Sequence, residues 1–337
     1  MKHVFVVGSH SPYLTSLGVI KQKKLKYSDV VFLFARHYHC CFHDTKYKTV
    51  DVSDVYLIYF RGSTRKELVN KVKIIDRLIE EEIGDNFVLY QAAVDFPFSQ
   101  ILATHQYCAE VKLIQEGIID FCSKIKIIDA LYCWLVNEFV LRSDRYWKSY
   151  KWNSNKRLKN KGITETFAIS EKLYKNIEVK HTIVQWPSFP ITRKFEEDSA
   201  FFLFESAVEM KLVEKELYLD ATNRMINKYS KSKNYVKFHP FQSKENVCKI
   251  KSIFEDQGLI YEELEDDIPM ELLLSSCQGL NIYGFSTSLI FFSMQLGHNA
   301  ISFVPALLAS KKFQKYWNRF SSHLSCYGKG HFLFKDL

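Results

Sequence analysis

The feature that most constrains the fold is an alternation of short strand and helix patterns across residues 235–297. Residues 235–238 have the aromatic and β-branched composition of a strand. Residues 244–254 predict a helix, because their apolar side chains recur at three- and four-residue spacing. A buried-looking strand at 279–283 and an apolar helix at 289–296 repeat the pattern. This rhythm is typical of a doubly wound α/β domain with a mostly parallel sheet.

Polar residues stand where two of these strands end. His239 and Pro240 follow the first strand, and Ser286, Thr287 and Ser288 follow the later one. Because parallel α/β sheets bind ligands beyond the carboxyl ends of their strands, both groups are expected at one ligand-binding edge. Three hydroxyl residues at a helix start also favour a phosphate there. The pattern predicts a nucleotide phosphate site, although each group alone is more typical of a turn histidine or an ordinary helix cap.

The sequence Lys237-Phe238-His239-Pro240, followed by Ser286-Thr287 before a helix, resembles the paired motifs of bacterial sialyltransferases of glycosyltransferase families 52, 80 and 38. The resemblance implies an α/β, GT-B fold, in which two Rossmann-like, doubly wound domains face a central cleft. It also implies CMP-sialic acid as the donor. His239 would then contact the CMP phosphate and assist its departure, and Ser286 and Thr287 would bind the same phosphate.

A further part of the resemblance concerns the nucleotide ribose. Residues 268–273 are similar to a helix start in that group whose glutamate holds the ribose, which places this role on Glu271. Enzymes that polymerise glycerol phosphate from CDP-glycerol share a similar layout, so the motifs indicate a cytidine nucleotide more firmly than sialic acid. The expected donor-binding residues are Lys237, Pro240, Glu271, Gly284, Ser286, Thr287, Ser288 and, in the first half of the chain, Gly8.

The first half of the chain supplies the candidates for a general base. Residues 111–117 predict a strand that ends in Gln115-Glu116-Gly117. The sialyltransferase group carries two acidic residues before a glycine at the corresponding place, and one of them is thought to deprotonate the acceptor hydroxyl. Here the first acidic position is Gln115, which leaves Glu116 as the candidate base. Asp95, just past another strand end, is the alternative, and a glutamate before a turn glycine is also common as a solvated residue.

The length of 337 residues suits two domains of about 150 residues each. The crossing expected at residues 187–197 divides the chain into an acceptor-side domain, 1–190, and a donor-binding domain, 191–337. Gly8 follows the first strand and would let a ligand approach the backbone. Further strands of the first domain are expected at residues 3–7, 30–34, 55–60 and 87–90, with an amphipathic helix at 64–82.

The net charge and the cysteine residues limit which partners and which cell compartment suit this protein. Lys and Arg outnumber Asp and Glu by 46 to 38, a surplus that favours anionic partners such as a nucleotide sugar, a glycolipid or an acidic membrane surface. The basic and aromatic residues at 142–161 suit a membrane interface, single-stranded nucleic acid or a solvated loop. Eight cysteines without a CxxC pair indicate neither zinc nor disulfides, and neither an export signal nor a membrane span is evident.

These observations together predict a cytoplasmic, inverting and metal-independent glycosyltransferase, with peripheral contact to the inner membrane as an open alternative. It would move sialic acid, or a related nonulosonic acid, from its CMP form to a bacterial glycan or glycolipid of the lipooligosaccharide or capsule. No cofactor or metal is expected, because His239 and the hydroxyl residues can stabilise the departing phosphate. A CDP-alcohol phosphotransferase is the nearest enzymatic alternative. A nucleic-acid-binding protein is less favoured, because the polar residues concentrate at strand ends instead of on a continuous basic face.

Overall fold

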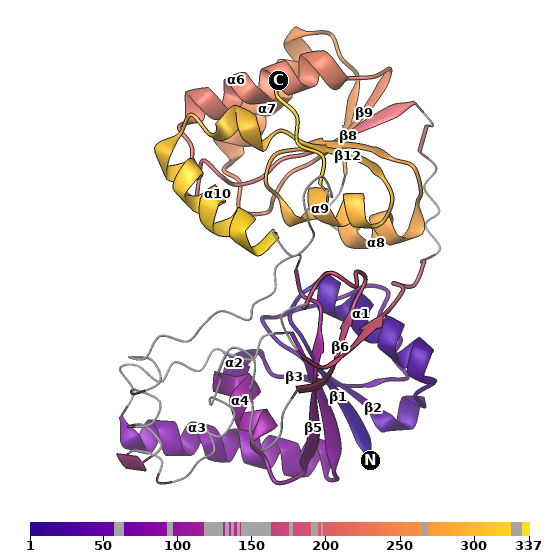
Figure 1. Cartoon of the computed structure of the whole chain (residues 1–337), viewed down its shortest axis with the longest axis vertical. Coiled ribbons are helices and arrows are strands. Elements are labelled where there is room, and N and C mark those ends of the chain that lie inside the picture. Colours follow the sequence, from indigo (N-terminus) through magenta and orange to yellow (C-terminus); the bar gives the residue numbers. More distant parts are fainter. Residues whose placement is uncertain are drawn as a thin grey trace. The chain divides into compact units, whose positions relative to one another are not determined.

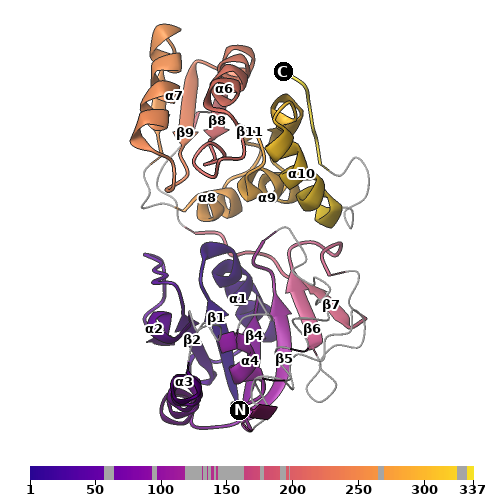
Figure 2. The same ribbon diagram turned by 90° about the vertical axis from the view of Figure 1, so that its left-hand side faces the viewer.

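The chain consists of two compact units, Met1–Pro187 and Ser188–Leu337, in the computed structural model (Figures 1 and 2). Each unit is a parallel sheet with helices against it. The structure describes the whole chain except residues 57–63, 93–96, 118–130, 132–134, 136–137, 140–141, 143–162, 175–177, 190–194, 197, 265–268 and 325–331, and the side chains of 322 and 323.

The first unit is built on a seven-stranded sheet in the order β3-β2-β1-β4-β5-β6-β7, and every neighbouring pair is parallel. Helix α1 covers one face of this sheet, and α2, α3 and α4 cover the other (Figure 1). The strands are β1 (Lys2–Val7), β2 (Val30–Phe34), β3 (Lys48–Asp51), β4 (Phe87–Gln91), β5 (Cys108–Ile114), β6 (Ile163–Ala168) and β7 (Lys180–Ile183). The helices are α1 (His10–Lys23), α2 (Ser53–Tyr56), α3 (Arg65–Leu78) and α4 (Pro97–Ala103).

The prediction of a strand at 55–60 is wrong for residues 55 and 56, the part of this range that the structure describes. Residues 53–56 form the short helix α2, and the third strand is β3, at the edge of the sheet beside β2. Asp51 Oδ1 accepts hydrogen bonds from the backbone N–H and the hydroxyl of Ser53, which caps a helical turn in place of a continued strand. Residues 57–60 lie outside the described part of the chain. The strands expected at 3–7, 30–34 and 87–90 are confirmed.

The amphipathic helix expected at 64–82 is also confirmed, with a different end. Thr64 caps α3 through a capping box with Glu67, so the helix starts where the sequence indicates. After Leu78 the chain continues as a π-helical turn, Ile79–Ile83, and leaves it at Gly84 with a φ of 64°. Leu68, Val72 and Ile75 form the buried face that packs on the sheet.

The second unit is built on a five-stranded sheet in the order β10-β9-β8-β11-β12, again with every pair parallel. Helix α6 packs against α7, and α8 packs against α9. The strands are β8 (Ser199–Leu203), β9 (Lys233–Lys237), β10 (Tyr261–Glu263), β11 (Asn281–Gly284) and β12 (Asn299–Ser302). The helices are α6 (Lys215–Tyr229), α7 (Lys244–Asp256), α8 (Met270–Ser276), α9 (Ser288–Gln295) and α10 (Lys311–Leu324).

Both sheets reverse their strand order once. The reversal lies between β1 and β4 in the first unit and between β8 and β11 in the second. At such a switch point the connections leave in opposite directions and open a crevice at the carboxyl ends of the strands, where α/β proteins bind ligands. The segments that follow β8 and β11 are therefore the first places to look for a site in the second unit.

One charged side chain is buried in the first sheet. Glu165 on β6 is 4% exposed and accepts hydrogen bonds from Lys23, Lys112 and Thr182, while Lys180 lies 3.2 Å away. Burial alone raises the pKa of Glu165, but these hydrogen bonds together outweigh burial and lower its pKa to about 2. The group joins the end of α1 to β5, β6 and β7.

Among the helices of the described residues, none is both long and apolar enough to cross a membrane.

Candidate functional site

Three chain segments lie at the carboxyl edge of the second sheet, near its switch point, because each of them follows a strand of that sheet. Glu205 follows β8, His239 follows β9, and Ser286 follows β11. Since β9, β8 and β11 are consecutive parallel strands of one sheet, these residues share one edge. The shared edge expected for His239 and the three hydroxyl residues is confirmed, and Glu205 is an addition that the sequence analysis did not include.

Ser286 is held by the carboxylate of Glu205. Its backbone N–H donates to Oε2 of Glu205 over 2.8 Å, and its hydroxyl donates to Oε1 over 2.8 Å. The backbone N–H of Thr287 donates to the same carboxylate. Glu205 is only 7% exposed. The carboxylate therefore lies at the start of α9, the position where the sequence indicates a ligand phosphate, and the hydroxyl proton of Ser286 is already used.

Thr287, and not Ser286, is the N-cap of α9. Its hydroxyl oxygen accepts from the backbone N–H of Leu289 over 3.4 Å, which leaves its own hydroxyl hydrogen for another acceptor. Ser288 is the first helical residue and is exposed. These two hydroxyl groups, together with the N-terminal end of the helix dipole, are the features of this segment that suit an anion.

The charge of Glu205 depends strongly on its surroundings. Burial raises its pKa to about 7, while the hydroxyl and N–H of Ser286 and the N–H of Thr287 oppose this effect. The backbone of Glu205 is fixed by Tyr218, whose hydroxyl oxygen lies 3.2 Å from both the N and the O of Glu205. Glu205 is consequently a positioned carboxyl group that changes its charge close to neutral pH.

His239 has one ring nitrogen bonded within its own turn. Its Nδ1 accepts from the backbone N–H of Phe241 over 3.1 Å, so Nε2 carries the proton of the neutral ring. The backbone N–H of His239 donates to Oε1 of Gln242 over 3.0 Å, which fixes the turn. Desolvation by the surrounding protein lowers the pKa of His239, against the opposing charge of Glu209. The ring is therefore a neutral hydrogen-bond donor near pH 7.

Lys237 and Glu271 come close enough to influence one another. Lys237 Nζ donates to the backbone oxygen of Leu264 over 3.3 Å. Burial raises the pKa of Glu271 in the first turn of α8, and its own backbone N–H and the charge of Lys237 act in the opposite direction. Pro240, also expected at the donor site, is exposed beyond the end of β9. Their expected contacts with a nucleotide remain predictions.

Gly284 has a packing role. A Cβ atom at this position would lie 2.8 Å from the backbone oxygen of Leu203 on β8. Real Cβ contacts are not that short, so β8 and β11 could not approach this closely with a larger residue. Because Glu205 and Ser286 follow these two strands, the glycine also sets the distance between them. Gly8 differs, since a Cβ there would meet only the flexible side chain of Arg36, at 3.3 Å.

At the corresponding edge of the first unit, Glu116 pairs with Arg36. Arg36 Nη1 donates to Oε1 of Glu116 over 3.3 Å, across Gly8. Gln115 is fully buried; its side chain donates to the backbone oxygen of Gly117 and accepts from the backbone N–H of Ile169. Gln115 thus holds the segment that carries Glu116. Asp95, the alternative base, lies outside the described residues.

Arg36 is a site residue that the sequence analysis missed. Its guanidinium lies 5.3 Å from the centre of the Tyr56 ring, in addition to the ion pair with Glu116. Arg36 and the next residue, His37, have φ angles of 59° and 53°. Two successive non-glycine residues in the left-handed region are uncommon and store backbone strain, which persists because the surroundings fix it. The available signal is a basic residue two positions after the strand at 30–34.

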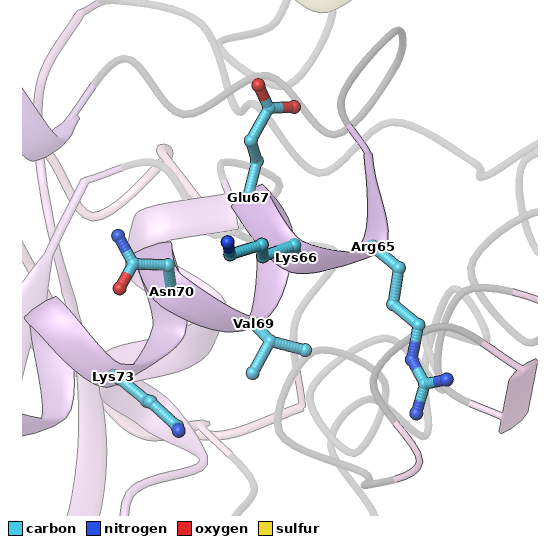
Figure 3. Close-up of a pocket in the computed structure, with 6 residues that line it drawn as sticks. All are labelled: Arg65, Lys66, Glu67, Val69, Asn70 and Lys73. Atoms are coloured by element: carbon cyan, nitrogen blue, oxygen red, sulfur yellow. The ribbon is translucent and has the colours of Figure 1, made fainter.

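A separate cavity of about 780 Å³ lies along α3 (Figure 3). Its described lining comes from one helix and is mostly basic or polar: Arg65, Lys66, Glu67, Val69, Asn70 and Lys73. None of the expected site residues belongs to this lining. Within the described part of the chain, no three His, Cys, Asp or Glu side chains lie close enough together to hold a metal ion.

No protein-family model matches the sequence, and no curated protein sequence matches it. The solved structures do contain similar chains. A Listeria monocytogenes protein assigned as a UDP-N-acetylglucosamine 2-epimerase is similar over 98% of this chain and 90% of its own, with a TM-score of 0.51 and 9% identity. The spinosyn rhamnosyltransferase SpnG is similar over 98% of this chain and 93% of its own, with a TM-score of 0.50 and 11% identity.

This chain has the GT-B fold. The expected fold class of two Rossmann-like, doubly wound domains is thereby confirmed. Identities of 9% and 11% carry the likeness no further than the fold.

Proposed function

We propose that this protein is a metal-independent, inverting glycosyltransferase that transfers a nonulosonic acid from its CMP-activated form to a glycan or glycolipid. The observation that carries the proposal is the placement of His239, after β9, and of the start of α9, after β11, at the same edge of the sheet on either side of β8. A neutral imidazole N–H, two hydroxyl groups and a helix dipole form a set of donors for a phosphate. The motif resemblance supplies the choice of cytidine.

On the donor side, the reaction breaks the bond between the anomeric carbon and a phosphate oxygen. The electron pair stays on that oxygen, and CMP leaves. His239 donates from Nε2 to the departing phosphate, and Thr287 and Ser288 donate from their hydroxyl groups. Glu271 holds the ribose hydroxyls, and Lys237 adds positive charge. Each of these groups acts without a metal ion, since CMP has no diphosphate that a cation must bridge.

On the acceptor side, an oxygen of the glycan forms the new bond to the anomeric carbon from the opposite face, which inverts the configuration. Glu116 takes the proton of that hydroxyl. A carboxylate beside a guanidinium is stabilised in its charged form, so Arg36 has to release Glu116 before proton transfer. Asp95 is the alternative base. The stretch 142–161, proposed as a contact with an anionic membrane, lies outside the described residues apart from Arg142.

The test is calorimetric titration of the purified chain with CMP, CDP, UMP and UDP, in buffer that contains a metal chelator. The proposal predicts preferential CMP binding, at least tenfold weaker in the double variant Thr287→Ala, Ser288→Ala, which removes the two hydroxyl groups proposed to donate to the phosphate. Ser252→Ala, which removes a hydroxyl from the body of α7, is the matched control and should bind normally. Release of CMP from CMP-sialic acid in the presence of a glycan acceptor then tests transfer.

The other outcomes separate the alternatives. Preference for CDP indicates a CDP-alcohol phosphotransferase instead. Preference for UDP indicates a uridine nucleotide sugar, which the name of the similar Listeria monocytogenes protein suggests. A chain that binds none of the four nucleotides is not a nucleotide-sugar enzyme of this kind.

A further inference from the structure

The carboxylate of Glu205 is an unusual group to find at a proposed phosphate site. It accepts from the N–H and hydroxyl of Ser286 over 2.8 Å each, and from the N–H of Thr287. These are donors of the kind that a phosphate would use. Glu205 is 7% exposed, so its carboxylate is held inside the protein and not in solvent. Any phosphate that binds at the start of α9 therefore binds beside this carboxylate.

Among the residues that the structure describes, no cationic side chain forms an ion pair with Glu205. The described titratable groups that interact with it electrostatically are Tyr218 on α6 and Tyr316 on α10, and both are neutral phenols whose own pKa is raised, first of all by burial. The donors from the start of α9 stabilise the charged form, and burial stabilises the protonated form. A negative charge on Glu205 is thus weakly screened, and a neighbouring anion interacts with it through protein and not through bulk water.

We propose that Glu205 is a specificity-determining residue of the phosphate site, which weakens the binding of a phosphate in proportion to its negative charge. The inference rests on the proposed function. In a sugar nucleotide with one phosphate, that phosphate is a diester with a single charge. After transfer it becomes a monoester, which carries between one and two charges at neutral pH because its second pKa is about 6. Glu205 accordingly favours the donor over the product and speeds release of the nucleotide.

The inference is tested with two ligands that differ in this charge and in one methyl group: CMP and its monomethyl phosphate ester, cytidine 5′-methyl phosphate. At pH 8 the wild-type chain should bind the diester at least about tenfold more tightly than CMP, from the repulsion expected between charges a few ångströms apart in protein. In Glu205→Gln, which keeps the shape and an acceptor for Ser286, CMP should gain affinity and the ratio should fall to about one. Glu214→Gln, an exposed carboxylate after the same strand, should keep the wild-type ratio.

A second measurement needs no variant. The charge of the diester is constant between pH 6 and pH 8.5. Any change in its affinity over this range therefore results from a titrating group of the protein. Affinity should fall as pH rises through about 7, where Glu205 loses its proton. Binding of both ligands with equal affinity and no pH dependence overturns this inference and leaves the proposed function intact. Binding of neither ligand by any of the proteins overturns the proposed function, and the inference with it.

Discussion

The buried carboxylate of Glu165 makes a quantitative prediction about folding. Glu165→Gln keeps the size of the side chain and removes the charge that Lys23, Lys112 and Lys180 share. The gap between the ordinary pKa of 4.5 and the value of about 2 corresponds to about 3 kcal/mol of folding free energy at neutral pH. The side chain of Lys180 is 68% exposed, so solvent screens part of this interaction. We therefore expect Glu165→Gln to lose about 2 kcal/mol.

The sign of the pH dependence follows from the lowered pKa. A carboxyl group whose pKa is lower in the folded state stabilises the protein fully above its unfolded pKa, here 4.5. This contribution disappears as the pH falls from 4.5 toward 2, because the folded and unfolded states then both carry the proton. The difference in stability between the wild type and Glu165→Gln should accordingly be constant above pH 5 and should narrow below it.

The assay is urea unfolding followed by circular dichroism between pH 7 and pH 3. Hydrogen exchange of peptides from β5 and β6 assigns the transition to the first unit. Glu110→Gln is the matched control: this carboxylate also contacts Lys112, at 3.3 Å, but is 43% exposed, so its loss should cost less than about 0.5 kcal/mol. A loss below about 0.5 kcal/mol for Glu165→Gln, or a difference that does not narrow in acid, would refute the reasoning.

Three further predictions concern the candidate site. His239→Ala should lower transfer about 100-fold while the urea midpoint stays unchanged, since the residue is exposed; normal turnover would remove it from the mechanism. Glu116→Gln should bind CMP normally by calorimetry and lose transfer by at least about 100-fold, and loss in Asp95→Asn instead would assign the base to that residue. Gly284→Ala should cost about 1 to 3 kcal/mol in urea unfolding, because the new methyl group meets a backbone oxygen at 2.8 Å. Gly8→Ala, which meets a flexible side chain, should cost less than about 1 kcal/mol, and equal costs would contradict the packing argument.

The sequence predicts the edge of the second sheet well, because two local facts suffice there. The strand patterns at 235–238 and 279–283 place the residues that follow them at a carboxyl edge, and the strands of the structure end within one residue of these bounds, at Lys237 and Gly284. Parallel strand order then brings both groups to one edge without any knowledge of side-chain contacts. Residues 55 and 56 show the limit of composition, since they belong to the helical turn that follows the hydrogen bond from Ser53 to the Asp51 side chain, although their residue types indicate a strand.

The sequence does not reveal contacts between residues that are far apart along the chain. Glu205 and Ser286 are 81 residues apart, and their hydrogen bonds depend on β8 and β11 being neighbours across the switch point. Glu205 lies two residues past the end of β8. Its burial and its partner follow only from the strand order. The contact between Arg36 and Glu116 is also hidden from the sequence. It depends on the left-handed backbone conformation of Arg36 and His37.

The state of Glu205 also bears on how the proposed reaction depends on pH. His239 is neutral near pH 7, and the proton of Ser286 is committed to Glu205, so few charges offset the departing phosphate. A proton on Glu205 removes one negative charge beside that phosphate. Since the pKa of Glu205 is raised to about 7, the helpful protonated form is lost as pH rises above this value.

The value of kcat/KM for a CMP-sugar should therefore fall above about pH 7, whereas the single charge of the donor phosphate does not change in this range. In Glu205→Gln the descending limb should disappear, because the amide carries no charge at any pH. A descending limb that persists in Glu205→Gln would show that another group is responsible. In that case the charge of Glu205 would not influence the rate of transfer.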